Sequence, residues 1–307
     1  WIASLTIDPC TGRLRDAASI APDRSFRETA PFEQTLAVFG GFTLKPLYMF
    51  LSLGLIIVLW RQAGPDLAAL RASFVFFLAG ELACEANFLL AHDRSALFEY
   101  LHSYGMVVAF ALAAFALAEG LDRRILHVSD PDAPCALLPL CGPCRKHANV
   151  PCGMRRILIL LVALTAGLSL IPLSMEIRPG SINTGIWGYA YNLSHPAVHQ
   201  IYEIRFLPLA AMGFSLAAFL PLLVRPAAGI EGPMRAAAAA AGALGFSLFR
   251  GFLCQAFAER QIWFGFWEEF SETLYVLGVI AVLWTFRGRL FHAAQASAGP
   301  SREAGGG

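Results

Sequence analysis

The chain has 307 residues, of which 57% are hydrophobic and only 15% charged, with a formal net charge of +1 and a mean hydropathy of +0.57. Soluble domains carry about 25% charged residues, so this apolar excess is too large for one globular core. The composition predicts an integral, multi-pass protein with the lipid bilayer as solvent, and we expect it in a bacterial cytoplasmic (inner) membrane. The near-neutral charge excludes nucleic acid as a partner.

The two ends of the chain differ from its apolar middle. Because the chain begins with Trp1 rather than Met, we expect a fragment or a processed product. Residues 1–35 mix charges, prolines and small residues and lack the apolar core of a signal peptide, so they are predicted to be an extracytoplasmic segment. Residues 36–291 are predicted to form the membrane domain, and residues 292–307 a disordered tail.

Seven segments are long and apolar enough to cross a bilayer as helices. In chain order they are residues 43–61, 72–91, 100–119, 156–174, 204–224, 235–257 and 265–286. The predicted fold is therefore all-α, a polytopic bundle of seven transmembrane helices. The first span is the weakest, because Lys45 and Pro46 interrupt it. The sixth has an alanine run at 236–241 followed by Gly242 and Gly245, which predicts a place inside the bundle.

The orientation follows from the placement of Arg and Lys, which gather on the cytoplasmic side. The connections 61–71, 120–156 and 225–235 and the end of the last span carry twelve cations: Arg61, Arg71, Arg123, Arg124, Arg145, Lys146, Arg155, Arg156, Arg225, Arg235, Arg287 and Arg289. The opposite connections, including the long one at 175–203, hold only Arg94, Arg178 and Arg260, with Arg205 just inside a span. The amino terminus is thus predicted outside and the carboxyl terminus in the cytoplasm.

Ionisable residues recur in the predicted outer half of four spans. These pocket-lining candidates are Glu81, Glu85, Glu99, His102, Arg250, Glu268, Glu269 and Glu272. Glu99 and His102 have an E-x-x-H spacing, which places them on one helix face. Just before the fifth span, His195, His199 and Glu203 are spaced four residues apart and form a candidate outer metal site.

Charges at such depths are costly unless they face the interior and find partners. Segments distant in sequence place polar groups in one layer, so we expect a shared, outward-facing acidic pocket. Its carboxylates outnumber Arg250, which favours a bound divalent metal ion or small cationic ligand; carboxylate and imidazole suit zinc, iron, manganese or copper. A proton-linked cavity is one alternative, and a structural ion pair of Arg250 with Glu272 or Glu85 is the other.

Four cysteines lie close together in the predicted cytoplasmic connection 120–156. Cys135, Cys141, Cys144 and Cys152 form the pattern C-x5-C-x2-C-x7-C within a Pro- and Gly-rich stretch. In a reducing compartment such a group indicates a metal site more often than disulfides. Zinc would take all four thiolates, and so would an iron–sulfur cluster. A redox dithiol at Cys141 and Cys144, or thiols without a ligand, remain as alternatives.

The patterns favour a membrane protein with an acidic cation-binding pocket outside and a four-cysteine metal centre inside. The competing hypotheses are a transmembrane redox protein, with an iron–sulfur or zinc loop as its cytoplasmic centre, and a seven-span sensor; other membrane proteins are expected partners of either. The last predicted span lacks the lysine that a retinal protein requires. Whether the protein is an enzyme is left open.

Overall fold

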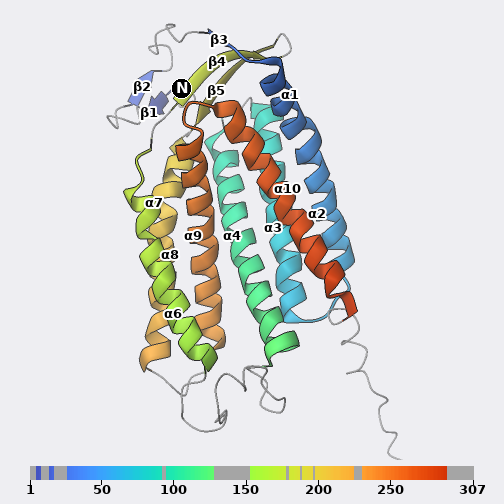
Figure 1. Ribbon diagram of the computed structural model, residues 1–307, viewed down its shortest axis with the longest axis vertical. Coiled ribbons are helices and arrows are strands. Elements are labelled where there is room, and N and C mark those ends of the chain that lie inside the picture. The colour runs from blue at the N-terminus through green and yellow to red at the C-terminus, as the bar shows by residue number, and fades with distance from the viewer. Residues whose placement is uncertain are drawn as a thin grey trace, which may run out of the picture.

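A computed structural model describes residues 5–7, 14–16, 26–91, 95–127, 153–177, 180–186, 189–195, 198–224 and 230–288. Long helices run side by side along one axis (Figure 1). The first long helix is continuous and consists of α1, the π-helix η3 and α2. The helices are α1 (Pro31–Phe39), η3 (Gly40–Leu44), α2 (Lys45–Leu59), α3 (Pro65–Ala91), α4 (Ala96–Leu121), η4 (Asp122–Leu126), α6 (Gly153–Leu168), α7 (Leu170–Ser174), α8 (Val198–Val224), α9 (Glu231–Ala256) and α10 (Gln261–Thr285).

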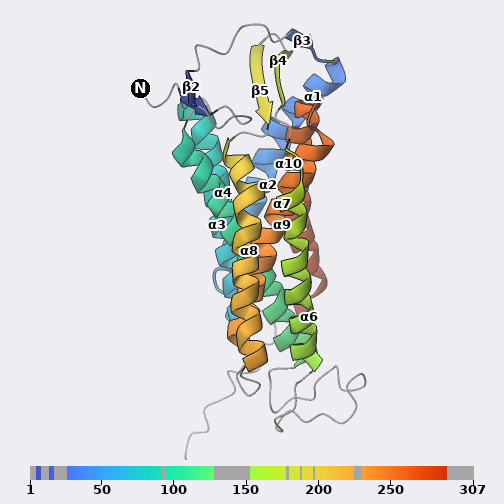
Figure 2. The same cartoon turned by 90° about the vertical axis from the view of Figure 1, so that its left-hand side faces the viewer.

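Short strands lie at the end of the bundle where α1 begins (Figures 1 and 2). β1 (Leu5–Ile7) pairs antiparallel with β2 (Leu14–Asp16). β4 (Gly180–Ile186) lies between β3 (Phe26–Glu28), its parallel partner, and β5 (Tyr189–His195), its antiparallel partner. The predicted outer connection 175–203 therefore contains a β-hairpin, which the all-α prediction did not include.

Within the part of the chain that the structure describes, six helical segments are long and apolar enough to cross a membrane, which confirms a multi-pass helical membrane protein. They are Pro31–Leu59, Pro65–Ala91, Ala96–Leu126, Arg155–Ser174, Gln200–Val224 and Gly232–Ala256. Large apolar side chains such as Phe50 and Leu160 are 73% and 68% exposed, as expected of a lipid-facing surface. The helix that corresponds to the seventh predicted span, α10, is not among the six, so the count of seven stays a prediction.

Two helices begin well before the apolar stretches that predicted them. The first was expected from residue 43 and begins at Pro31; the second was expected from residue 72 and begins at Pro65. Proline is favoured in the first helical turn, because its missing N–H group has no partner to lose there. Hydropathy marks the part of a helix that suits lipid, whereas these helices continue past it.

Small residues bring the central helices into close contact. A Cβ atom added to Gly105 of α4 would lie 3.0 Å from the Cα atom of Gly80 in α3, and one added to Gly242 of α9 would lie 2.5 Å from the backbone nitrogen of Ala111 in α4. Of the six candidate spans, the one in α9 is the most buried, which confirms that the alanine-rich segment lies inside the bundle. This packing fixes α3, α4 and α9 next to one another, and their polar residues with them.

Candidate functional site

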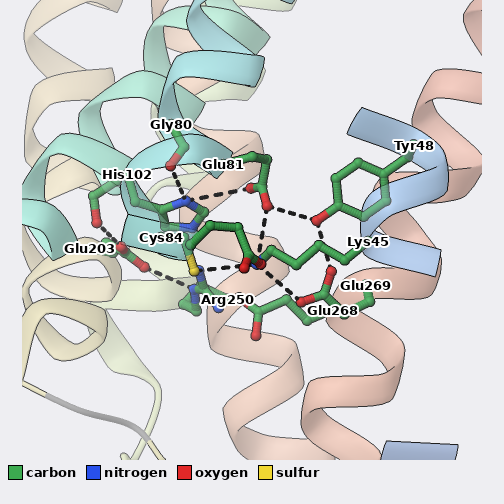
Figure 3. Close-up of polar contacts among 12 residues, drawn as sticks. Lys45, Tyr48, Gly80, Glu81, Cys84, His102, Glu203, Arg250, Glu268 and Glu269 are labelled. Carbon is green, nitrogen blue, oxygen red and sulfur yellow. Dashed lines mark hydrogen bonds and ion pairs between the residues drawn. The ribbon is translucent and has the colours of Figure 1, made fainter. Parts of the chain in front are cut away.

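Lys45, a residue only 7% exposed, places its ammonium group among several acidic side chains. Its Nζ atom is 3.2 Å from Oε2 of Glu81 in α3 and 3.4 Å from Oε1 of Glu269 in α10. Tyr48, one turn further along α2, places its hydroxyl oxygen 2.7 Å from Glu81 Oε2 and 2.7 Å from Glu269 Oε2 (Figure 3). We call Lys45, Tyr48, Glu81, Glu269 and Glu272 the Lys45 cluster.

Tyr48 cannot satisfy both of its carboxylate neighbours at once. A phenol has a single hydrogen, so it donates to Glu81 or to Glu269, but not to both. The other short contact of the Tyr48 oxygen then requires either a proton on the carboxyl group or a cation that both oxygen atoms contact. A protonated carboxyl group and a bound cation would each satisfy this requirement.

Glu81 is fully buried, and its Oε1 atom has no hydrogen-bond partner among the described residues. Nδ1 of His102 lies 3.4 Å from that atom. The same ring nitrogen lies 3.2 Å from the carbonyl oxygen of Gly80. Since both neighbours of Nδ1 are acceptors, the hydrogen belongs on Nδ1, which donates to the carbonyl. A buried carboxylate oxygen is thus left short of a donor.

The second cluster surrounds Arg250 of α9, which is 1% exposed. Its Nε atom donates to Oε2 of Glu203 in α8 at 2.8 Å, and its Nη1 atom donates to Oε1 of Glu268 in α10. Ser103 of α4 donates to the other oxygen of Glu203. We call Ser103, Glu203, Arg250 and Glu268 the Arg250 cluster. Its guanidinium group is held by two carboxylates, as a buried charge requires.

Neighbouring residues on two helices divide between the two clusters (Figure 3). On α10, Glu268 contacts Arg250 whereas Glu269 contacts Lys45 and Tyr48. On α4, His102 lies beside Glu81 whereas Ser103 bonds Glu203. Successive residues of a helix point about 100° apart, so one helix can serve two sites on adjacent faces. The two clusters therefore adjoin, with α4 and α10 as their common walls.

Three carboxylates of the Lys45 cluster are placed as metal ligands would be. Glu81, Glu269 and Glu272 each offer an oxygen atom, and these atoms lie within 4.8 Å of one another. Glu272 is 5% exposed and forms no ion pair with any Lys, Arg or His side chain that the structure describes. Three carboxyl groups lie close to one ammonium group, so ionisation of all three would leave two negative charges without a fixed cation. Carboxylate oxygens suit hard divalent cations such as Mg²⁺, Ca²⁺ and Mn²⁺.

The structure brings most of the pocket candidates together, but the contacts differ from the pairs that the sequence analysis suggests for Arg250 and for Glu99 with His102. Arg250 bonds Glu203 and Glu268 rather than Glu272 or Glu85. The side chain of Glu85 is 33% exposed and lies at the edge of the Lys45 cluster. Glu99 accepts a hydrogen bond from Asn87 Nδ2 at 2.5 Å instead of joining His102 beside Glu81. The E-x-x-H pair is thus divided between two environments.

The predicted outer metal site is only partly described. His195 ends the strand β5 and His199 belongs to α8, so the three residues are not on successive turns of one helix, because a change of element separates them. The side chains of His195 and His199 lie outside what the structure describes, and Glu203 points at Arg250. Cys135, Cys141, Cys144 and Cys152 also lie outside the described residues.

Sequence reasoning missed Lys45 and Tyr48, which the structure places at the centre of the site. Lys45 was treated as an interruption of the first span. The signal was available, because lysine occurs only twice in the chain, at positions 45 and 146, and one of the two lies within a predicted span. An ionisable residue inside a membrane helix is a functional candidate by default. Tyr48 carried no comparable signal.

Comparison of the chain with known proteins finds no matching protein family, curated protein or solved structure.

Proposed function

We propose that this multi-pass membrane protein binds a divalent metal ion at the buried carboxylates Glu81, Glu269 and Glu272. The observation that carries the proposal is the burial of Glu272 beside two other carboxylates without an ion pair to any described cation. A lone buried carboxylate is costly in a bilayer unless it is neutralised. A divalent ion, together with the ammonium group of Lys45 nearby, would balance three ionised carboxylates. A small organic cation of the same charge would meet the same requirement.

We further propose that α10 is the seventh span. Its 25 residues correspond to about 37 Å, enough to cross the hydrocarbon core. The carboxylates that lower its hydropathy, Glu268, Glu269 and Glu272, face the two clusters, while Leu274 and Trp284 on its surface are 52% and 69% exposed. Seven spans place the termini on opposite sides. The bias of Arg and Lys then puts the site in the outer half of the membrane and the carboxyl terminus in the cytoplasm.

Binding of Mn²⁺ to the purified protein in lipid nanodiscs, followed by electron paramagnetic resonance, tests the site. Mn²⁺ prefers oxygen ligands, so it discriminates against a thiolate site elsewhere in the chain. We expect one Mn²⁺ for each wild-type chain and loss of that binding in Glu272→Gln. The matched control is Glu119→Gln, since Glu119 is also a buried glutamate but pairs with Arg123 outside the cluster. Equal binding by wild type and Glu272→Gln refutes the assignment.

The four cysteines are proposed to form a second, cytoplasmic metal centre, on the basis of their spacing alone. Zinc gives colourless protein with one zinc for each chain, whereas an iron–sulfur cluster gives brown protein with iron and acid-labile sulfide. The latter result would support the competing proposal of an electron-transfer protein. Replacement of Cys144 by serine is expected to remove that metal and to leave Mn²⁺ binding at the glutamates unchanged. Metal content and an absorption spectrum of anaerobically purified protein decide between the two.

A further inference from the structure

Lys45 already occupies part of the space that the proposed metal ion needs. Its Nζ atom lies 3.2 Å from Glu81 and 3.4 Å from Glu269, which are two of the three candidate ligands. An ammonium group and a metal ion cannot both contact the same oxygens at close range without strong repulsion. Either the metal ion is excluded, or Lys45 moves.

The surroundings of Lys45 offer a second position for its ammonium group. Glu85, one helical turn from Glu81 along α3, lies 3.7 Å from Nζ and is 33% exposed at the side chain. Among the carboxylates within 4 Å of the ammonium group that the structure describes, it is the one outside the metal triad; the Sγ atom of Cys84, at 3.3 Å, is a further neighbour. Lys45 can therefore remain paired with Glu85 while it releases Glu81 and Glu269. The flexible four-carbon stem of lysine permits a shift of this kind.

The backbone next to Lys45 is also unusual. The π-helix Gly40–Leu44 ends immediately before it, and π-helical turns inside α-helices are frequent at functional sites. Gly40 begins that π-helix, and a Cβ atom added to it would lie 3.8 Å from Cγ of Glu269. The π-helix that precedes Lys45 thus begins beside the side-chain stem of Glu269, whose carboxylate must be released.

We propose that Lys45 is a tethered cation that the incoming divalent ion displaces from Glu81 and Glu269, and that the ammonium group then stays with Glu85. This inference rests on the proposed metal site. The fully buried Oε1 atom of Glu81 supports it independently, because that oxygen has no donor among the described residues even with Lys45 beside Oε2. Lys45 supplies part of the positive charge of the site when the metal is absent and sets the affinity at which the metal enters.

The test compares Mn²⁺ affinity in wild type, Lys45→Met, Glu85→Gln and the double variant. Removal of the competing ammonium group is expected to tighten binding about tenfold or more, since juxtaposed like charges cost several kcal/mol. Glu85→Gln is expected to weaken binding about threefold, as befits a partly exposed ion pair. If Glu85 acts through Lys45, its substitution has no effect once Lys45 is methionine.

The outcomes separate the two proposals. Equal affinity of wild type and Lys45→Met, or an effect of Glu85→Gln that persists in the double variant, overturns the displacement while the metal site stands. Failure of wild type and Lys45→Met alike to bind Mn²⁺ overturns both. Lys45→Arg serves as the charge-retaining control and should not reproduce the gain in affinity.

A second measurement avoids any loss of folding in Lys45→Met. The chain has two lysines, so Lys146→Arg leaves Lys45 as the only side-chain amine. Acylation of that amine by a small amine-reactive ester is expected to be slow without Mn²⁺, because the ammonium group is buried among carboxylates. Saturating Mn²⁺ should accelerate it as the group moves towards the more exposed Glu85. An unchanged or slower rate contradicts the displacement.

Discussion

The Arg250 cluster and the Lys45 cluster adjoin in one half of the bundle, yet they differ in how completely their charges are compensated. Arg250 bonds Glu203 and Glu268 and lies 5.3 Å above the ring centre of Phe246. In the Lys45 cluster one ammonium group faces three carboxylates, and Glu81 keeps an unsatisfied oxygen. The charges of the Arg250 cluster are thus paired within the protein, whereas the Lys45 cluster keeps a buried oxygen atom without a described donor, and this difference is why the metal ion is proposed to bind at the Lys45 cluster.

The largest effect is expected from the fully paired cluster. Arg250→Met would leave Glu203 and Glu268 buried without their cation and lower the free energy of unfolding by about 3–5 kcal/mol. Thermal or denaturant unfolding in detergent measures the change. Arg287→Met is the control, because Arg287 is exposed beside Trp284 and should cost less than about 1 kcal/mol. Similar losses in the two variants would mean that the Arg250 cluster does not hold the helices together.

The close contact of α3 and α4 affects the Lys45 cluster more than the Arg250 cluster. These two helices carry Glu81 and His102, whereas Arg250 lies on α9. Gly105→Ala places a Cβ atom 3.0 Å from Gly80 and should cost about 1–3 kcal/mol of unfolding free energy by overpacking. It should also weaken Mn²⁺ binding. Gly167→Ala, with nothing within 4 Å of the new atom, is the control and should be neutral or slightly stabilising. Equal behaviour of the two alanines would contradict the tight interface.

Tyr48→Phe probes the hydroxyl group between Glu81 and Glu269. Hydrogen-bonding partners of metal-ligating groups orient those groups, so we expect Mn²⁺ affinity to fall about tenfold. Titration of Mn²⁺ into nanodisc-embedded protein gives the affinity. Tyr104→Phe is the matched control, because its hydroxyl group contacts only the exposed Tyr202 hydroxyl at 3.2 Å among the described residues. A comparable loss in the control would point to a general disturbance of the fold.

The smallest effect on stability is expected from Glu85→Gln. The side chain is 33% exposed and 3.7 Å from Lys45, so its pairing resembles a surface ion pair worth less than about 1 kcal/mol. Equilibrium unfolding should barely distinguish the variant from wild type. A loss as large as that of Arg250→Met would show that Glu85 belongs to the structural core of the cluster.

Physical reasoning from the sequence predicted that the intramembrane charges would gather, since lipid does not tolerate lone charges. The structure does bring Glu81, Glu269 and Glu272 together. The sequence did not predict that Glu268 and Glu269 would face different clusters. That division depends on which helices flank α10 and not on the helical period of α10 itself.

Other features escaped prediction for equally specific reasons. The strand pairing of residues 26–28 with 183–185 joins segments far apart in the chain, so no local pattern reports it. The helix starts at Pro31 and Pro65 lie outside the apolar stretches from which the spans were read. From the sequence, Lys45 is interpreted only as an interruption that weakens the first predicted span, whereas the structure places it among the buried carboxylates.

The most direct test of the metal site is a crystal of the protein soaked with Mn²⁺ and measured near the manganese absorption edge. An anomalous-difference peak bounded by the carboxylates of Glu81, Glu269 and Glu272 is the predicted result. A peak only at the cysteine-containing loop, or no peak within the helical bundle, would contradict the proposal.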